Sequence, residues 1–292
     1  MKKRYEELTF ADDFMFCKIM QSNPDLCREL TQLLLGKRIG KIIKLNKQHP
    51  IEITADGRGV RFDIYMEDDA NTVYNIEMQA GTVANIAFRT RYYQGMIDLD
   101  QIERGARFQD LRKTYIIFIC LENPFPEIGL HKYSFQSMCA EQPQLELGDG
   151  VQKVLISASG TQEDVSEDLK SFLNYVAGKL PESDLTKKLE ELVSNAREHI
   201  EWRKEYMTLL ERDERMREEG REEGLKDGRE EGLKEGRVKE HIRGLRVLIR
   251  TLRKYTENEQ DLLDEIMKHP EYSDITPDEI RAILEECVCT DK

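Results

Sequence analysis

Two acidic residues and one amide in neighbouring strand-like segments of this sequence could together hold a divalent metal ion. Asp63 lies within the segment GVRFDIYM, and Glu77 and Gln79 lie within VYNIEMQ. Side chains alternate along a strand, so Glu77 and Gln79 project to one face, and Ile76 and Met78 project to the other. A short polar loop joins the segments and predicts antiparallel neighbours, so Asp63 and Glu77 can point towards a common site.

Two carboxylates that converge repel each other, and a divalent cation removes this repulsion. Mg²⁺ prefers hard oxygen ligands, and the backbone carbonyl of Met78 would add one; Mn²⁺ or Ca²⁺ are alternative ions. Such a metal polarises a scissile phosphate and lowers the pKa of an attacking water. Gln79 would orient that water without supplying charge. The alternative is that Asp63 and Glu77 are ordinary outward residues of half-exposed strands.

The elements that must position these residues form an alternating helix and strand pattern over residues 1–182. We expect two short helices broken near Asn23-Pro24, with Gly36 as a C-cap, and a helix over 82–103. Strands are expected at 39–45, 51–54, 60–66, 73–79 and 115–121. The last of these is an apolar run typical of a strand buried on both faces. Asp56-Gly57 predicts a hairpin turn.

Two further segments follow this core. Residues 183–240 are predicted to be one highly charged helical region, and residues 241–292 a small helical C-terminal segment. Glycine occurs at every fourth position of the charged region, at Gly220, Gly224, Gly228, Gly232 and Gly236. This stripe indicates either close helix contact in a homo-oligomer or a low-complexity spacer. The basic helix over 241–256 either contacts DNA or pairs its charges with acidic neighbours.

The charge and cysteine content narrow the class of protein. The chain has 292 residues, of which 39% are hydrophobic and 35% charged, and its formal net charge is −13. The stretch 37–51 is nonetheless basic and makes Lys41 and Lys44 candidates for phosphate contact. Six scattered cysteines favour buried free thiols over a zinc site or a disulfide framework. Without an apolar leader or a membrane-length run, we expect a cytoplasmic protein with no membrane association.

Four motifs in order resemble those of the PD-(D/E)XK nuclease family transposases, also described as recombination-promoting nucleases. They are DDFMFCKIM at 12–20, RFDIY at 61–65, NIEMQ at 75–79 and FRTRYYQGMI at 88–97. The similarity covers roughly residues 8–120 and extends more loosely to about 240. It implies a restriction-endonuclease-like α/β fold, with a mixed central sheet flanked by helices, and Mg²⁺-dependent cleavage of DNA.

The resemblance also implies roles for particular residues. Asp63 matches the family's metal-binding Asp and Glu77 its second acid, while Gln79 falls where the wider superfamily has Lys. A neutral amide cannot supply charge to the transition state, so this position departs from the wider pattern. Asp13 is a candidate acid from the first helix.

Arginine residues near these motifs are further candidates. Arg89, Arg91 and Tyr93 match the family's motif helix and would contact phosphate or orient the acids; alternatively, they form a salt-bridged, packed helix. Arg61 lies two residues before Asp63 in the same predicted strand. Its parity predicts that it projects from the same face.

The acid pair and the resemblance together predict a metal-dependent DNA endonuclease, and the resemblance implies an association with DNA recombination or mobile elements. Cutting both strands of a duplex needs two active sites, which favours a homodimer or a higher homo-oligomer. One alternative is a catalytically silent DNA-binding or protein-interaction module on a nuclease scaffold. Another is a partner-binding scaffold organised by the charged helix.

Overall fold

The chain folds into two compact units. The computed structural model describes residues 3–47, 50–51, 59–102, 105–256, 258–272 and 275–289. The first unit comprises Met1–Thr208 and the second Leu209–Lys292. The division into the segments 1–182, 183–240 and 241–292 remains a proposal about domain organisation. The predicted Asp56-Gly57 turn lies outside the described residues.

A six-stranded mixed sheet forms the centre of the first unit. Its strand order is β1-β4-β5-β6-β8-β7. The strands are β1 (Ile42–Lys47), β4 (Ile64–Asp68), β5 (Thr72–Gln79), β6 (Lys113–Cys120), β7 (Lys132–Phe135) and β8 (Val151–Ser157). The β5–β6 and β6–β8 pairs are parallel, and the other pairs are antiparallel. A separate antiparallel pair consists of β2 (Pro50–Ile51) and β3 (Val60–Arg61). The predicted mixed sheet is confirmed.

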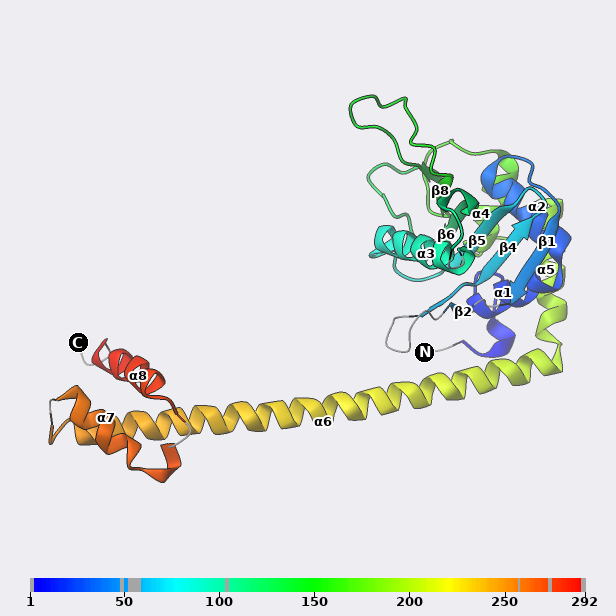
Figure 1. Cartoon of the computed structure of the whole chain (residues 1–292). Helices are drawn as coiled ribbons and strands as arrows, with labels where there is room; N and C mark the ends of the chain where they lie inside the picture. Colours follow the sequence, from blue (N-terminus) through cyan, green and yellow to red (C-terminus); the bar gives the residue numbers. More distant parts are fainter. Residues whose placement is uncertain are drawn as a thin grey trace. The chain divides into compact units, whose positions relative to one another are not determined.

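Helices cover both faces of this sheet (Figure 1). They are α1 (Asp13–Ser22), α2 (Pro24–Leu35), α3 (Ile86–Gln101), α4 (Glu167–Val176) and α5 (Asp184–Arg197), with short 3-10 turns η1 (Tyr5–Glu7) and η2 (Phe108–Asp110). Buried residues of α1, α2, α4 and α5 share one core with Ile76 and Met78 of β5. Buried residues of α3 form a second core on the opposite face. The predicted alternation along β5 is therefore confirmed, and Glu77 lies on the α3 face.

Local sequence signals set the ends of the first two helices. Asn23 separates α1 from α2, and Pro24 begins α2, where its missing amide costs no hydrogen bond. Gly36 ends α2 with a φ of 70°, a left-handed conformation that glycine adopts without strain. The predicted break and C-cap are both present.

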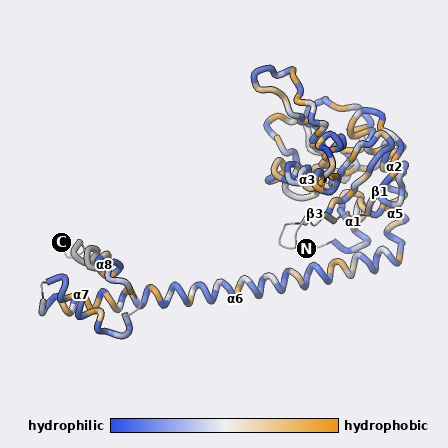
Figure 2. Tube along the Cα trace, in the orientation of Figure 1, coloured by the Kyte–Doolittle hydropathy of each residue, from blue (hydrophilic) through white to orange (hydrophobic). Residues whose placement is uncertain are grey.

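The charged region differs from the single helical region that we predicted. It is divided between α5 and α6 (Ile200–Leu252), with Glu198 and His199 between them. Helix α6 also continues past residue 240 without a break. Residues 211–240 are exposed throughout, and this part of the tube is mostly hydrophilic (Figure 2). The residues before position 240 are exposed and mostly charged, so no change in packing ends the helix at that position.

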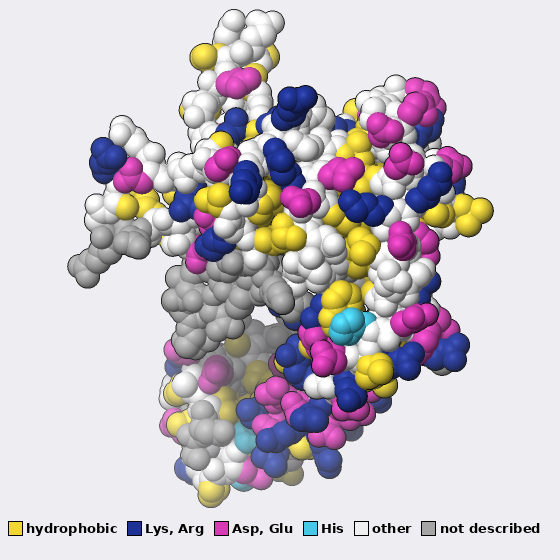
Figure 3. All heavy atoms as spheres, turned by 90° about the vertical axis from the view of Figure 1, so that its right-hand side faces the viewer, with side chains coloured by type: hydrophobic (Ala, Val, Ile, Leu, Met, Phe, Trp, Pro, Cys, Tyr) yellow, Lys and Arg dark blue, Asp and Glu magenta, His cyan; other side chains and the backbone are white. Residues whose placement is uncertain are grey.

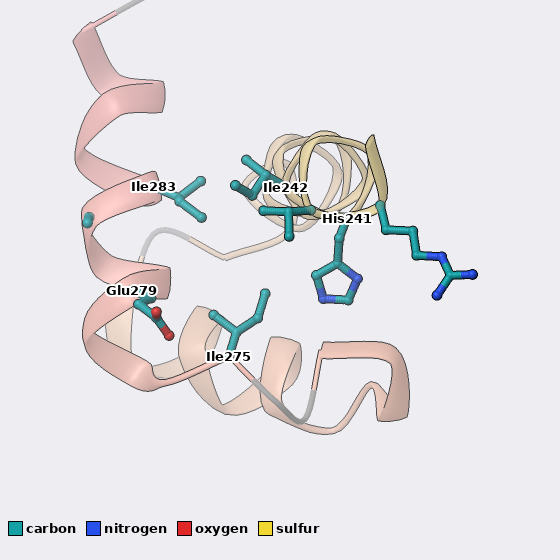
Figure 4. A pocket seen from close by; sticks show the side chains of 8 residues that line it. His241, Ile242, Ile275, Glu279 and Ile283 are labelled. Atoms are coloured by element: carbon teal, nitrogen blue, oxygen red, sulfur yellow. The ribbon is translucent and has the colours of Figure 1, made fainter. Parts of the chain in front are cut away.

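The second unit has a small core of its own. The end of α6 packs with α7 (Glu259–Met267), the 3-10 turn η3 (Pro270–Tyr272) and α8 (Pro277–Cys289). Leu245 and Ile249 are fully buried in this core, which accounts for the amphipathic spacing in the basic helix. Ile242, Ile275 and Ile283 line an apolar pocket of the unit (Figure 4). Among the described residues, no helix is long and apolar enough to cross a membrane.

Asp68 is a buried anchor for the loop that joins β4 to β5. Its carboxylate accepts hydrogen bonds from the amides of Gly40, Ala70 and Thr72 and from the hydroxyl of Tyr74, at 2.9–3.1 Å. We expect Asp68→Ala to lower the free energy of unfolding by about 3 kcal/mol or more, because buried donors lose their acceptor. Urea unfolding followed by tryptophan fluorescence would measure this.

The control for this prediction uses an exposed acid of the same unit. The only tryptophan, Trp202, lies in the first unit, so its fluorescence reports on that unit. Glu127→Ala changes an exposed residue and should alter stability by less than about 0.5 kcal/mol. Equal stability of the Asp68→Ala variant and the unchanged chain would show that the hydrogen bonds of Asp68 contribute little.

Candidate metal and nucleic-acid site

Asp63 lies at a bend between β3 and β4, and not in the middle of one strand as we predicted. Two hydrogen bonds hold the bend against β5. The Asp63 amide donates to Oε1 of Glu77 at 3.1 Å, and the Met78 amide donates to Oδ2 of Asp63 at 3.0 Å. Each carboxylate thus accepts a hydrogen bond from a backbone amide of the segment that carries the other acid. Because the strand is interrupted here, the parity argument for Arg61 does not apply.

One face of α1 supports this bend from the other side. Asp13, Cys17 and Gln21 are four residues apart, so they lie along one helix face. The backbone carbonyl of Asp63 accepts hydrogen bonds from the Cys17 thiol at 3.6 Å and from Nε2 of Gln21 at 3.3 Å. The Cys17 thiol also lies 3.3 Å from Oδ1 of Asp13. Helix α1 therefore fixes both the position of Asp63 and its distance from Asp13.

These contacts create an acid cluster, which we define as Asp13, Asp63 and Glu77. One ligand atom from each of Asp13, Cys17 and Asp63 lies within 4.8 Å of the others. Asp13 is exposed, Asp63 is half-buried and Glu77 is buried, with 4% of its surface accessible. The cluster therefore extends from solvent into the protein. Its carboxylate oxygens suit Mg²⁺, whereas the Cys17 thiol is a soft donor that suits Mg²⁺ poorly.

Burial and mutual repulsion make the acid cluster unfavourable when it is fully charged. Burial raises the pKa of Asp63 well above its usual range, and the neighbouring charges of Glu77 and Asp13 raise it further. Burial also raises the pKa of Glu77 to about 8, against the opposing effects of the Asp63 amide and Arg89. Converging acids with raised pKa values fit a site completed by a cation.

The cysteine within the site stays protonated. Burial raises the pKa of the Cys17 thiol, and the charges of Asp63 and Asp13 raise it further. The thiol thus acts as a hydrogen-bond donor to its neighbours. Cys17, Cys27 and Cys120 are buried free thiols, in agreement with the sequence analysis, while Cys139 is partly exposed.

Gln79 is engaged at both ends of its amide. Arg89 donates to its Oε1 at 2.5 Å, and its Nε2 donates to the Thr82 carbonyl at 2.8 Å. The guanidinium of Arg89 lies over the rings of Phe118 and Tyr93, at 5.0 and 5.7 Å from the ring centroids. Gln79 therefore positions Arg89 in this structure.

The other basic candidates lie in different surroundings. Nζ of Lys44 forms an ion pair with Glu67 at 2.8 Å, and Arg112 also pairs with Glu67. Lys41 is exposed, and its backbone amide donates to Asp69. Neither lysine contacts the acid cluster in the described part of the chain. Arg61 and Arg91 are exposed and line a groove beside α3.

Sequence reasoning missed Cys17 and Gln21 as supports of the site. The signal was available in the four-residue spacing from Asp13, which puts all three on one helix face. That spacing gained meaning only once α1 was placed against the bend at Asp63.

The fold and the acid cluster together define a nuclease-like α/β core. The sequence profile of the PD-(D/E)XK nuclease family transposases matches residues 11–222. The chain belongs to this family, and its function is of the nuclease type, with nucleic acid as the substrate. Searches of curated proteins and of solved structures found no match. Nucleases of this kind generally use divalent metal ions.

Proposed function

We propose that this protein is a metal-dependent DNA endonuclease whose catalytic site is built around Asp63 and Glu77. The observation that carries the proposal is the pair of exchanged hydrogen bonds between the Asp63 bend and β5. These bonds hold the half-buried Asp63 and the buried Glu77 together, although burial and repulsion raise the pKa of each. If Asp63 and Glu77 had no function, uncharged residues at these two positions would make the fold more stable.

The proposed ligands of a divalent cation are carboxylate oxygens of Asp63, Glu77 and Asp13 and the backbone carbonyl of Met78. Mg²⁺ is the ion that best suits these oxygens, with Mn²⁺ and Ca²⁺ as alternatives. When bound, the ion would neutralise charge on the scissile phosphate and lower the pKa of the attacking water. Cys17 and Gln21 would be positioning residues because they act through the Asp63 backbone.

Arg89 is the residue that we propose to face the phosphate. Its guanidinium is held by Gln79 and lies against two aromatic rings, so it is oriented before substrate binds. A fixed cation near the reacting group stabilises the charge that develops in the transition state. In the hydrolysis, the water oxygen bonds to phosphorus, the bond to the leaving sugar oxygen breaks, and that oxygen gains a proton.

The raised pKa of Glu77 predicts that a rise in pH lowers the stability of the metal-free chain, whereas metal binding raises the stability. The pKa of a glutamate in an unfolded chain is near 4.5, and here it is about 8. Between these values the folded chain binds more protons. Without metal, its free energy of unfolding should therefore fall as pH rises, by up to about 1.4 kcal/mol per unit for one proton. This contribution is complete below about pH 4.5 and is lost through about pH 8.

Metal binding displaces these protons, so Mg²⁺ should raise the melting temperature more at about pH 8 than at about pH 6. Thermal unfolding followed by Trp202 fluorescence, with EDTA or with Mg²⁺, would measure both effects. The Glu77→Gln variant serves as the control, and its stability in EDTA should fall less steeply as pH rises, because Asp63 is then the remaining acid of the pair with a raised pKa. A Mg²⁺ shift that is the same at both pH values would argue against a site made of these acids.

The partners and biological setting follow from this activity as proposals. We propose that DNA is the substrate, that the protein acts in the cytoplasm, and that it serves DNA recombination or a mobile element. Cleavage of both strands favours a homodimer. The five glycines from Gly220 to Gly236 offer an open helix face for contact between copies, because a Cβ added at any of them would meet nothing within 4 Å. A monomeric mass by light scattering would contradict the dimer.

Incubation with matched DNA and RNA substrates tests the substrate class. We expect Mg²⁺-dependent cleavage of DNA that EDTA abolishes, and little cleavage of RNA of the same sequence. Cleavage of RNA alone would keep the nuclease chemistry and overturn DNA as the substrate.

A further inference from the structure

A groove of about 590 Å³ lies between β3 and α3, beside the acid cluster. We call it the arginine groove. It is lined by Gly59, Val60, Arg61, Asn85, Phe88, Arg89, Arg91, Tyr92, Tyr93, Gly95, Met96 and Leu99. Arg89 belongs both to this lining and to the hydrogen bond with Gln79, so the groove and the proposed catalytic site share this residue.

The charge of the arginine groove is of one sign. Among the residues that the structure describes, its lining contains three arginines and no acidic residue. Arg61 and Arg91 form no ion pair with any acid in the part of the chain that the structure describes. By contrast, acidic and basic side chains are interspersed on the face shown in Figure 3. A cationic hollow on a chain with a net charge of −13 is complementary to a phosphate backbone.

The groove also presents aromatic rings to solvent. Phe88 is 63% exposed and Tyr92 is 41% exposed, although both lie on a helix whose other face is buried. The guanidinium of Arg91 lies 5.6 Å from the centroid of the Phe88 ring. Exposed aromatic rings beside arginines form a surface on which nucleic-acid bases stack.

We propose that the arginine groove binds an unpaired stretch of the substrate strand next to the scissile phosphate. This inference rests on the proposed nuclease function and specifies its substrate. Phe88 and Tyr92 would stack on bases, and Arg61 and Arg91 would contact the phosphates between them. Arg89 would mark the end of the groove that adjoins the acid cluster.

The aromatic lining favours unpaired strands over duplex DNA. In a duplex, the faces of the bases are stacked on one another, so only their edges and the phosphates are accessible. An unpaired strand exposes base faces, which a ring such as Phe88 can cover. Arginines alone would bind both forms through phosphate, so the exposed rings set the preference.

Fluorescence anisotropy with the full chain in EDTA tests the groove without cleavage. The probes are a labelled single strand of about 15 nucleotides, its duplex, and the same strand with abasic sites in place of its central bases. We expect Phe88→Ala to weaken single-strand binding about tenfold or more, and duplex binding less than about twofold. Arg91→Gln should weaken both, because it removes a phosphate contact.

Matched control variants lie outside the groove. Phe108→Ala removes an aromatic ring that is 86% exposed, and Arg107→Gln removes an exposed arginine; neither residue lines the groove. Both should leave single-strand binding within about twofold. Tight binding of the abasic strand, or equal effects of Phe88→Ala on strand and duplex, would overturn the proposal.

A separate cleavage assay in Mg²⁺ keeps the two proposals distinguishable. If the chain cleaves DNA but Phe88→Ala leaves single-strand binding unchanged, the groove proposal fails and the nuclease proposal stands. If single strands bind through Phe88 but no metal supports cleavage, the nuclease proposal fails and the groove is a nucleic-acid site.

Discussion

Asp63→Asn is expected to lower the rate of DNA cleavage in Mg²⁺ by about 10³-fold or more, which corresponds to about 4 kcal/mol of transition-state stabilisation. Asp63 is bound from both α1 and β5. Its backbone carbonyl accepts a hydrogen bond from Cys17 of α1, and its carboxylate accepts one from the Met78 amide of β5. The substitution removes a charge that faces both Asp13 and Glu77. Asparagine keeps the shape and an oxygen that can accept the Met78 amide, so the bend should persist.

The rate is measured as conversion of a labelled duplex under single-turnover conditions. Asp25→Asn serves as the control because Asp25 is an exposed acid in the first turn of α2, and its rate should stay within about twofold. Cleavage by Asp63→Asn at the unchanged rate would place the catalytic site elsewhere or reveal a contaminating nuclease.

Glu77→Gln is expected to reduce cleavage by about 10²-fold to 10³-fold, which corresponds to about 3–4 kcal/mol. The glutamine oxygen can still accept the Asp63 amide, so the substitution changes the charge more than the shape. The same variant should be more stable than the unchanged chain in EDTA near pH 8. Its side chain stays neutral, whereas burial penalises the charged form of Glu77 and raises its pKa to about 8.

Opposite effects on activity and stability separate a catalytic role from a folding role. Parallel measurement of the cleavage rate and of urea unfolding provides both values. A Glu77→Gln chain that loses activity and stability together would indicate that Glu77 supports the fold instead.

Much of the framework of the site could be predicted from the sequence, because the relevant signals are local. Alternation along β5 fixes which face carries Glu77, and the Asn23-Pro24 pair and Gly36 set the ends of α1 and α2. The bend at Asp63 could not be predicted. Residues 60–66 have a strand-like composition, and the bend depends on hydrogen bonds to Met78 and Gln21, which are distant in sequence.

The role of Gln79 was likewise hidden from the sequence. Its residue type indicates hydrogen bonding, but only the placement of α3 shows that Arg89 occupies its oxygen. In the long helix α6, uniform exposure removes the packing signals that would mark a boundary near residue 240. The role of Gln79 depends on a tertiary contact, and the missing boundary near residue 240 reflects the lack of such contacts.

The most direct test of a metal-dependent nuclease at Asp63 and Glu77 is nicking of supercoiled plasmid by the purified full chain. The assay compares Mg²⁺, Mn²⁺, Ca²⁺ and EDTA, with Asp63→Asn and Glu77→Gln purified in parallel and matched for folding. We expect nicking with Mg²⁺ or Mn²⁺, none in EDTA, and none by either variant on the same timescale. Nicking that persists in EDTA or in both variants, or no nicking with any ion, would contradict the account.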